Sequence, residues 1–175
     1  DEKKVVKIFL SSGYDITYHD DEILKLLITK YKKLNISASS KIPQLSEFIC
    51  NLDPNITRIK FELGIECDAV FSLHMLPYCL TTLSIVCDNL TVPLDNLPAT
   101  LLNLQIKSAQ SYEFSLNLLP HGLKTLHIES KYNKNLYNLP PNLNSLLIKE
   151  IEVPNTLCEL PAGLKILCID EFYPF

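Results

Sequence analysis

The residue types that usually perform chemistry occur in this chain without the spacing that chemistry needs. No two cysteines form a C-x-x-C pair, no histidine stands at zinc-ligand spacing from them, and the four glycines are scattered, so there is no phosphate-cradling loop. Covalent catalysis requires a nucleophile, a base and a group that orients the base, and the sequence does not supply all three together. We therefore predict no enzyme activity, no metal site and no cofactor. The histidines are His19, His74, His121 and His127.

The six cysteines are expected to be free thiols. Four of them fall inside repeated segments, where a small apolar side chain packs acceptably: Cys79, Cys87, Cys158 and Cys168. Cys50 and Cys67 flank one expected strand, and the sequence leaves open whether they form a disulfide. Cysteines without a clear disulfide framework favour a reducing, intracellular compartment, and no signal peptide is visible.

The second half of the chain repeats one phrase five times, Leu-Pro-x-x-Leu-x-x-Leu-x-Ile. Its prolines are 21, 22, 20 and 21 residues apart, which is the period of short leucine-rich repeats, and they are Pro77, Pro98, Pro120, Pro140 and Pro161. Burying the few aliphatic side chains of one unit contributes about 1.5 to 3 kcal/mol each. Ordering some twenty residues costs about 1.5 kcal/mol apiece. One unit alone cannot fold, so the units must stack and share a continuous core.

The same register extends toward the N-terminus. Ile56, Ile59 and Phe61 fit the phrase with the proline displaced by one place, and earlier apolar residues fit two further units. We expect a single domain, 1–175, of about eight repeats. Residues 1–75 form the longer repeats and residues 76–175 the short ones of 20 to 22 residues. Leu104, Leu126 and Leu146 should lie side by side on neighbouring strands.

The longer repeats have room for helices and the short ones do not. Apolar residues at helical spacing predict helices over 20–30, 43–52 and, more weakly, 68–76. We call the segment that connects one strand to the next a return. Prolines and asparagines in the returns of the later repeats predict extended or 3₁₀ segments. The predicted fold class is therefore α/β, a leucine-rich-repeat solenoid with a concave parallel β-sheet and helices on the convex side of the N-terminal repeats.

Successive side chains of a strand point to opposite faces of the sheet, so every second side chain is expected on the concave face. Its first rows are basic, its middle is polar, and its last two rows expose apolar residues, which suits a protein ligand with an acidic end and an apolar end. A solvated sheet that binds nothing is the alternative interpretation. The candidate partner-binding residues are Lys7, Lys33, Arg58, Lys60, Gln105, His127, Leu147 and Ile166.

Composition narrows the class of partner. The net charge of -4 and the pI near 5.5 give no general attraction to nucleic acid or to anionic membranes. The basic rows lack the interleaved aromatic residues of nucleic-acid sites, and the apolar stretches are too short to span a bilayer. A protein partner is therefore expected. A homodimer through the C-terminal repeat is also expected as an alternative, because the last strand has no polar cap.

The repeated phrase, over nearly all of residues 76–169, resembles the short leucine-rich repeats of bacterial type III effectors such as IpaH and YopM. It is also similar to the FNIP-related repeats of amoebae and giant viruses. In the IpaH relatives the repeats recognise a substrate, and a separate helical domain carries a C-x-D cysteine for ubiquitin transfer. Cys168-Ile-Asp170 matches C-x-D, but it lies in the last repeat strand and we expect no helical domain around it, so we interpret the match as accidental.

We therefore expect an intracellular protein-interaction module, in the cytoplasm or in a host cytoplasm for an effector. The resemblance implies a role as the substrate-recognition part of a ubiquitin-ligase or effector system. The alternative is a self-associating structural scaffold joined through its terminal repeat.

Overall fold

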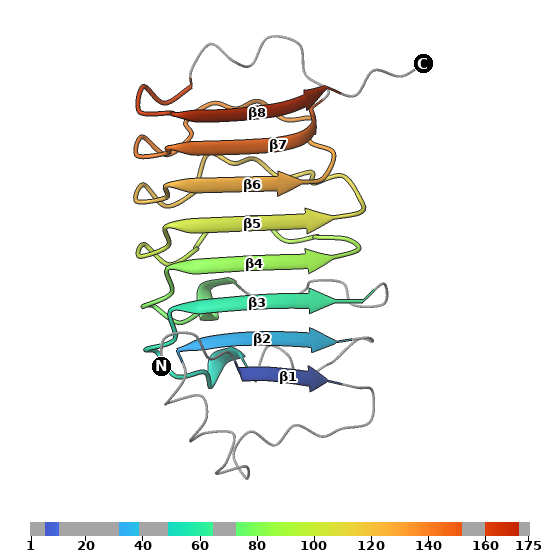
Figure 1. Ribbon diagram of the computed structural model, residues 1–175, viewed down its shortest axis with the longest axis vertical. Coiled ribbons are helices and arrows are strands. Elements are labelled where there is room, and N and C mark those ends of the chain that lie inside the picture. The colour runs from blue at the N-terminus through green and yellow to red at the C-terminus, as the bar shows by residue number, and fades with distance from the viewer. Residues whose placement is uncertain (1–5, 11–31, 39–48, 65–72, 152–159, 172–175) are drawn as a thin grey trace.

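The fold is a solenoid built on one parallel β-sheet (Figure 1). The computed structural model describes residues 6–10, 32–38, 49–64, 73–151 and 160–171. Eight strands follow one another in the sheet in chain order, and every neighbouring pair is parallel. They are β1 (Val6–Leu10), β2 (Lys33–Ala38), β3 (Arg58–Leu63), β4 (Thr82–Cys87), β5 (Asn103–Ser108), β6 (Thr125–Glu129), β7 (Ser145–Ile151) and β8 (Ile166–Glu171).

The predicted register of the repeats is confirmed. Leu104 of β5 pairs with Leu126 of β6, which pairs with Leu146 of β7. Buried and exposed positions alternate along β3 to β6, so that the leucine and isoleucine of each phrase point into the core. This two-residue period is the one that a strand with a single buried face requires.

The Pro-x-x-Leu part of the phrase is a turn that leads into each strand. The leucine N–H donates to the proline carbonyl three residues earlier in all five copies, for example Leu80 to Pro77 at 3.0 Å. The N–H groups of Thr81 and Thr82 then both donate to the carbonyl of Thr57 in the preceding unit. This turn holds each strand against its predecessor before the sheet ladder begins.

The displaced proline of the third unit fits the same turn. Ile56 donates to the carbonyl of Asp53 at 3.1 Å, so Asp53 occupies the proline position and Pro54 the next one. Proline is favoured at the second position of a type I or II turn because its φ is already fixed there. The register therefore survives the displacement.

The asparagine two residues before the proline has a structural role in two units. Asn96 and Asn138 occupy this position and have φ values of 59° and 55°. Asparagine tolerates this left-handed conformation better than most residues because its short polar side chain bonds locally. The chain can therefore reverse toward the next Leu-Pro without a glycine.

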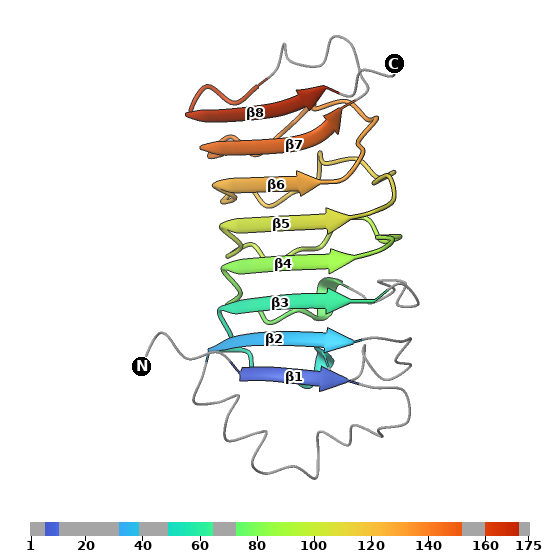
Figure 2. The ribbon, with the colours of Figure 1, turned by 45° about the vertical axis from the view of Figure 1, so that its right-hand side comes forward.

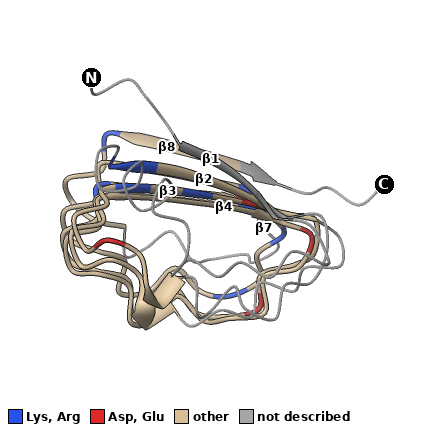
Figure 3. Ribbon diagram, turned by 90° about the horizontal axis from the view of Figure 1, so that it is seen from below, with Lys and Arg blue, Asp and Glu red and all other residues tan. Residues whose placement is uncertain are grey.

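The core lies between the sheet and the return segments, which run along its other side (Figure 3). The turned ribbon shows the strands stacked as one column (Figure 2). Tyr112 and Tyr132 are fully buried in two consecutive returns, and their rings stack with centroids 6.3 Å apart. Their backbones form parallel bridges, Tyr112 to Tyr132 and Tyr132 to Ile151. The returns are therefore stacked in register, as the strands are.

The described residues do not confirm the α/β assignment. They contain one 3₁₀ helix, η1 (Leu73–Met75), and two helical residues, 49 and 50, where a described range begins. The predicted helix over 20–30 lies outside the described residues, as do most of 43–52 and the first half of 68–76. Between residues 76 and 151 the returns are turns and bends, because Pro and left-handed Asn interrupt any helical run. The described part of the chain is a parallel β-solenoid.

Two equivalent serines at the ends of β5 and β6 should respond oppositely to loss of the hydroxyl. Ser108 donates to the carbonyl of Asp88 at 3.0 Å, whereas the buried Ser130 hydroxyl has no hydrogen-bond partner. An unsatisfied buried polar group costs about 1 to 3 kcal/mol, and a satisfied hydrogen bond contributes about 1 kcal/mol. We expect Ser108→Ala to lower the free energy of unfolding by about 1 kcal/mol and Ser130→Ala to leave it unchanged or raise it. Urea unfolding measures both, and equal losses would contradict the assignment.

Candidate binding face

One face of the sheet carries side chains that are not used in the core, and we call it the outer sheet face. It is the face that the sequence predicts to be concave. All of its described side chains are exposed or half-buried. They are Lys33, Asn35, Ser37, Arg58, Lys60, Glu62, Thr82, Ser84, Val86, Asn103, Gln105, Lys107, Thr125, His127, Glu129, Ser145, Leu147, Lys149, Ile166 and Cys168.

The structure brings three of the predicted basic residues together. Lys33 of β2 is in register with Arg58 of β3, and Lys60 follows Arg58 on the same face. Arg58 is exposed and Lys33 is half-buried. Lys7 lies in β1 opposite Asn35, but its side chain is outside the described part of the structure.

Glu62 accepts several hydrogen bonds beside this basic group. Its carboxylate forms an ion pair with Lys60 and accepts a hydrogen bond from the Ser37 hydroxyl at 3.0 Å. The Lys60 hydrogen bond, followed by that of Ser37, lowers the pKa of Glu62 below its usual range. Glu62 is therefore an ionised carboxylate that is paired with the ammonium of Lys60.

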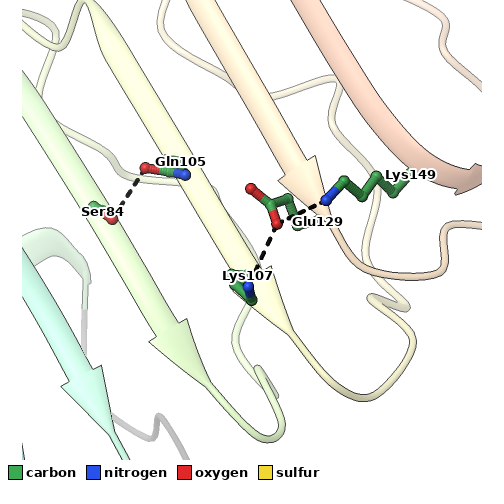
Figure 4. A network of polar contacts seen from close by, with 5 residues as sticks. All are labelled: Ser84, Gln105, Lys107, Glu129 and Lys149. Carbon is green, nitrogen blue, oxygen red and sulfur yellow. Dashed lines mark hydrogen bonds and ion pairs between the residues drawn. The ribbon is translucent and has the colours of Figure 1, made fainter. Parts of the chain in front are cut away.

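A second group of charges spans β5, β6 and β7 (Figure 4). The Glu129 carboxylate lies 3.0 Å from the Lys149 ammonium and 3.6 Å from that of Lys107. On the neighbouring strands Ser84 donates to the Gln105 side-chain oxygen at 3.4 Å. Three consecutive units are thus linked by side chains at the same strand position.

The ion pairs of Glu129 should make stability depend on pH at the acid end. The hydrogen bond from Lys149 lowers the pKa of Glu129 below its usual 4.5. A carboxylate with a lowered folded-state pKa contributes stability above its unfolded pKa, and this contribution is lost as pH falls through the folded value. We expect Glu129→Gln to lose less than about 1 kcal/mol at pH 7, because these pairs are partly exposed.

The unfolding free energy of the Glu129→Gln variant is compared with that of the wild-type protein at neutral and at acid pH. The two unfolding free energies should converge as the pH falls from 4.5 through the lower folded-state pKa of Glu129, where the wild-type carboxylate becomes protonated. Urea unfolding at pH 7 and at pH 3 measures the convergence. A difference between variant and wild type that stays constant with pH would contradict the assignment.

The outer sheet face becomes apolar toward its C-terminal end. Gln105, His127, Leu147 and Cys168 are in register across four strands, with Gln105 exposed and His127 half-buried. Ile166, opposite Ser145, has 60% of its surface exposed. The predicted candidates therefore form two groups, a basic one on β2 and β3 and a polar-to-apolar one on β5 to β8, separated by β4.

Sequence reasoning missed the pairing of the outer charges. Lys107, Glu129 and Lys149 alternate in sign at one position of three consecutive repeats, and this alternation is the signal that predicts the network. The ion pair of Lys60 follows from the presence of Glu62 two residues later on the same face.

The described cysteines are free thiols, namely Cys50, Cys79, Cys87 and Cys168. Burial raises the pKa of Cys87 to about 11, so its sulfur is a neutral thiol at physiological pH. Cys67 and Cys158 lie outside the described residues. Among the residues that the structure describes, no cluster of three or more His, Cys, Asp or Glu side chains could hold a metal ion.

No helix in the described ranges has the length and apolar character needed to cross a membrane. The chain matches no protein-family model, no curated protein and no solved structure.

Proposed function

We propose that the chain is a leucine-rich-repeat protein whose outer sheet face binds another protein inside the cell, with no catalysis of its own. The observation that carries this proposal is the register of seven strands, β2 to β8, which holds a continuous array of exposed side chains on hydrogen-bonded backbone. Binding groups on rigid strands lose little conformational freedom when a partner docks. Stacked repeats generate extended surfaces that repeat proteins use in this way.

The resemblance to effector repeats supports a more specific role. In that role the chain recognises a substrate for a ubiquitin ligase or an effector system. The same proposal includes helices on the convex side of the first repeats, over 20–30, 43–52 and 68–76.

The C-x-D match at Cys168 and Asp170 does not contribute to this proposal. Cys168 is exposed on strand β8 with its neighbours in sheet register, and a ligase cysteine would have to come from another domain.

Site-specific photo-crosslinking tests the binding face. A photoreactive residue would replace Ser84 or Gln105 on the outer sheet face and, as matched controls, the exposed Glu113 or Asn117 on the returns. With proteins from cells that express the chain, we expect the outer positions to crosslink one common partner and the return positions to yield none of it. Equal crosslinking from both sides would contradict the proposal.

A second function is favoured by one specific observation at β8, the last strand that the structure describes. Leu167 has 44% of its surface exposed, whereas Leu104, Leu126 and Leu146 at the equivalent position are almost completely buried by the next unit. A second copy of the chain could cover this surface, and the protein would then be a self-associating scaffold.

Light scattering over a range of concentrations tests self-association. The scaffold function requires a mass of twice 19.9 kDa that returns to 19.9 kDa in a Leu167→Glu variant. The matched control is Leu118→Glu, because Leu118 is exposed on a return. A wild-type chain that stays monomeric, or a dimer that survives Leu167→Glu, would exclude this function.

A further inference from the structure

The described part of the sheet ends at β8, which has an apolar edge (Figure 1). Among the residues that the structure describes, no strand lies beyond β8 in the order of the sheet. Residues 166 to 169 are Ile, Leu, Cys and Ile, with no charge among them. Ile166 and Leu167 have 60% and 44% of their surfaces exposed, and Cys168 is exposed as well. A strand edge that no charge or proline protects is a template for pairing with another strand.

The backbone of β8 presents its hydrogen-bonding groups on the side away from β7. The Ile166 N–H donates to the Asn144 carbonyl at 3.0 Å, which is toward β7. The N–H and C=O groups of successive strand residues point alternately to the two neighbouring strands, so those of Leu167 and Ile169 point away from β7. Two residues separate these donor and acceptor pairs, and this is the spacing that an antiparallel neighbour requires.

This edge is complementary to a second copy of itself. A two-fold axis perpendicular to the sheet, placed beside Cys168, brings a second β8 alongside in the antiparallel direction and keeps both cores on one side. Leu167 then exchanges two hydrogen bonds with Ile169 of the second copy, and Ile169 exchanges two with its Leu167. Leu167 and Ile169 are in register with the buried Leu146 and Ile148 of β7. The apolar end of each described array would therefore cover that of the other.

Charge selects this register among the neighbouring ones. Lys165 precedes Cys168 by three residues and Glu171 follows it by three, so the axis at Cys168 places a positive residue opposite a negative one. An axis at Leu167 would place Lys165 opposite Ile169, and an axis at Ile169 would place Glu171 opposite Leu167. Both alternatives set a charged residue against an apolar one in line with the core positions.

We propose that two copies of the chain associate by antiparallel pairing of their β8 strands, with Cys168 of each copy at the two-fold axis. This inference deepens the second function proposed above, self-association, and rests on it. The two Cys168 residues form a non-hydrogen-bonded pair, whose Cα atoms are about 4.5 Å apart in antiparallel sheets. Disulfides span Cα distances of about 4.4 to 6.8 Å, so the two thiols can be linked without moving the backbone.

Oxidative crosslinking tests the position of the axis. The purified, reduced chain would be oxidised briefly with copper–phenanthroline, and non-reducing electrophoresis with peptide mass spectrometry would identify the link. We expect a covalent dimer joined from Cys168 to Cys168, and Cys168→Ser should reduce its yield about tenfold or more. The matched control is Cys50→Ser, which removes another exposed thiol and should leave the yield unchanged.

Charge reversal tests the register independently of the thiols. In the Lys165→Glu variant the proposed register sets like charges opposite each other at both ends of the interface, so the dissociation constant of the dimer should rise about tenfold. Adding Glu171→Lys restores opposite charges and should return the constant to within about twofold of wild type. The matched control is Lys124→Glu, because Lys124 is exposed at the equivalent position two units earlier and should have no effect.

The outcomes separate this inference from the function on which it rests. A chain that stays monomeric in light scattering would overturn both. A dimer that does not link through Cys168, or that responds equally to Lys165→Glu and Lys124→Glu, would overturn the β8 pairing and leave self-association standing. Thermal melting of each variant checks that it is folded.

Discussion

Leu126→Asp should unfold several repeats at once. Leu126 has none of its surface exposed and lies between Leu104 and Leu146 on the neighbouring strands. An ionised carboxylate at this place would be buried without a partner, which is among the few single changes that cost more than about 4 kcal/mol. Stability in a stacked array depends on the interfaces between neighbours, so the damage should spread to the adjoining units.

Circular dichroism during urea or thermal unfolding measures the loss. The matched control is Thr125→Asp, one residue earlier on the outer sheet face, where the same charge remains in water. That control should lower the free energy of unfolding by less than about 1 kcal/mol. A Leu126→Asp protein that melts as wild type does would show that the buried face has been assigned to the wrong residues.

Tyr112→Ala should be the most damaging change in the returns. The ring is fully buried and packs against Tyr132 and Phe114, with centroids 6.3 and 5.7 Å away. Truncating a large buried aromatic residue to alanine costs about 3 to 5 kcal/mol. The matched control is Tyr137→Ala, because Tyr137 is a tyrosine of the returns with 40% of its surface exposed.

The contribution of the Tyr112 hydroxyl to stability can be measured separately from that of its ring. Its oxygen accepts a hydrogen bond from the Leu94 N–H at 3.0 Å and donates to the Val92 carbonyl at 3.3 Å. Tyr112→Phe leaves that N–H buried without a partner and should cost about 1 to 3 kcal/mol, less than Tyr112→Ala. Urea unfolding of the three variants gives the order. Equal stabilities of the Tyr112→Ala and Tyr137→Ala variants would contradict the assignment of Tyr112 to the buried core.

The sequence predicts the strands well because their signal is local and repeated. The positions of Leu-x-Ile identify the buried face in each unit, and the Pro-x-x-Leu turn fixes where the strand begins, as Leu80 and Pro77 show. Even the displaced Pro54 keeps the register, because Asp53 supplies the same carbonyl. Stacking then follows from the repeat itself and needs no long-range information.

The returns were harder to predict because their order depends on the neighbouring unit. In the sequence, Tyr112 and Tyr132 lie in largely polar segments. Both rings are nevertheless buried in the structure, and the phenol oxygen of each forms a hydrogen bond with the backbone of the preceding return. Burial raises the pKa of Tyr132 to about 12. The spacing of about one repeat between the two tyrosines is the signal that shows them to be core residues.

The sequence predicts which residues lie on the binding face, but it does not predict which of their charges form ion pairs. Alternation places Lys60 and Glu129 on the outer sheet face without showing that each has an ion-pair partner, since side-chain reach decides the pairing. Alternation alone therefore makes Lys60 equivalent to Lys33 and Arg58, whereas in the structure Lys60 is paired with Glu62.

The stacking of one strand per repeat is the central claim, and distances between spin labels along the outer sheet face test it most directly. In a background whose natural cysteines are replaced, labels would be placed in pairs at Lys60 with Leu147, Lys60 with Cys168, and Asn35 with Cys168. These pairs are four, five and six strands apart. At about 4.8 Å per strand the backbone separations should be about 19, 24 and 29 Å, rising by one strand spacing each time. Distances that do not increase in this order would contradict the solenoid.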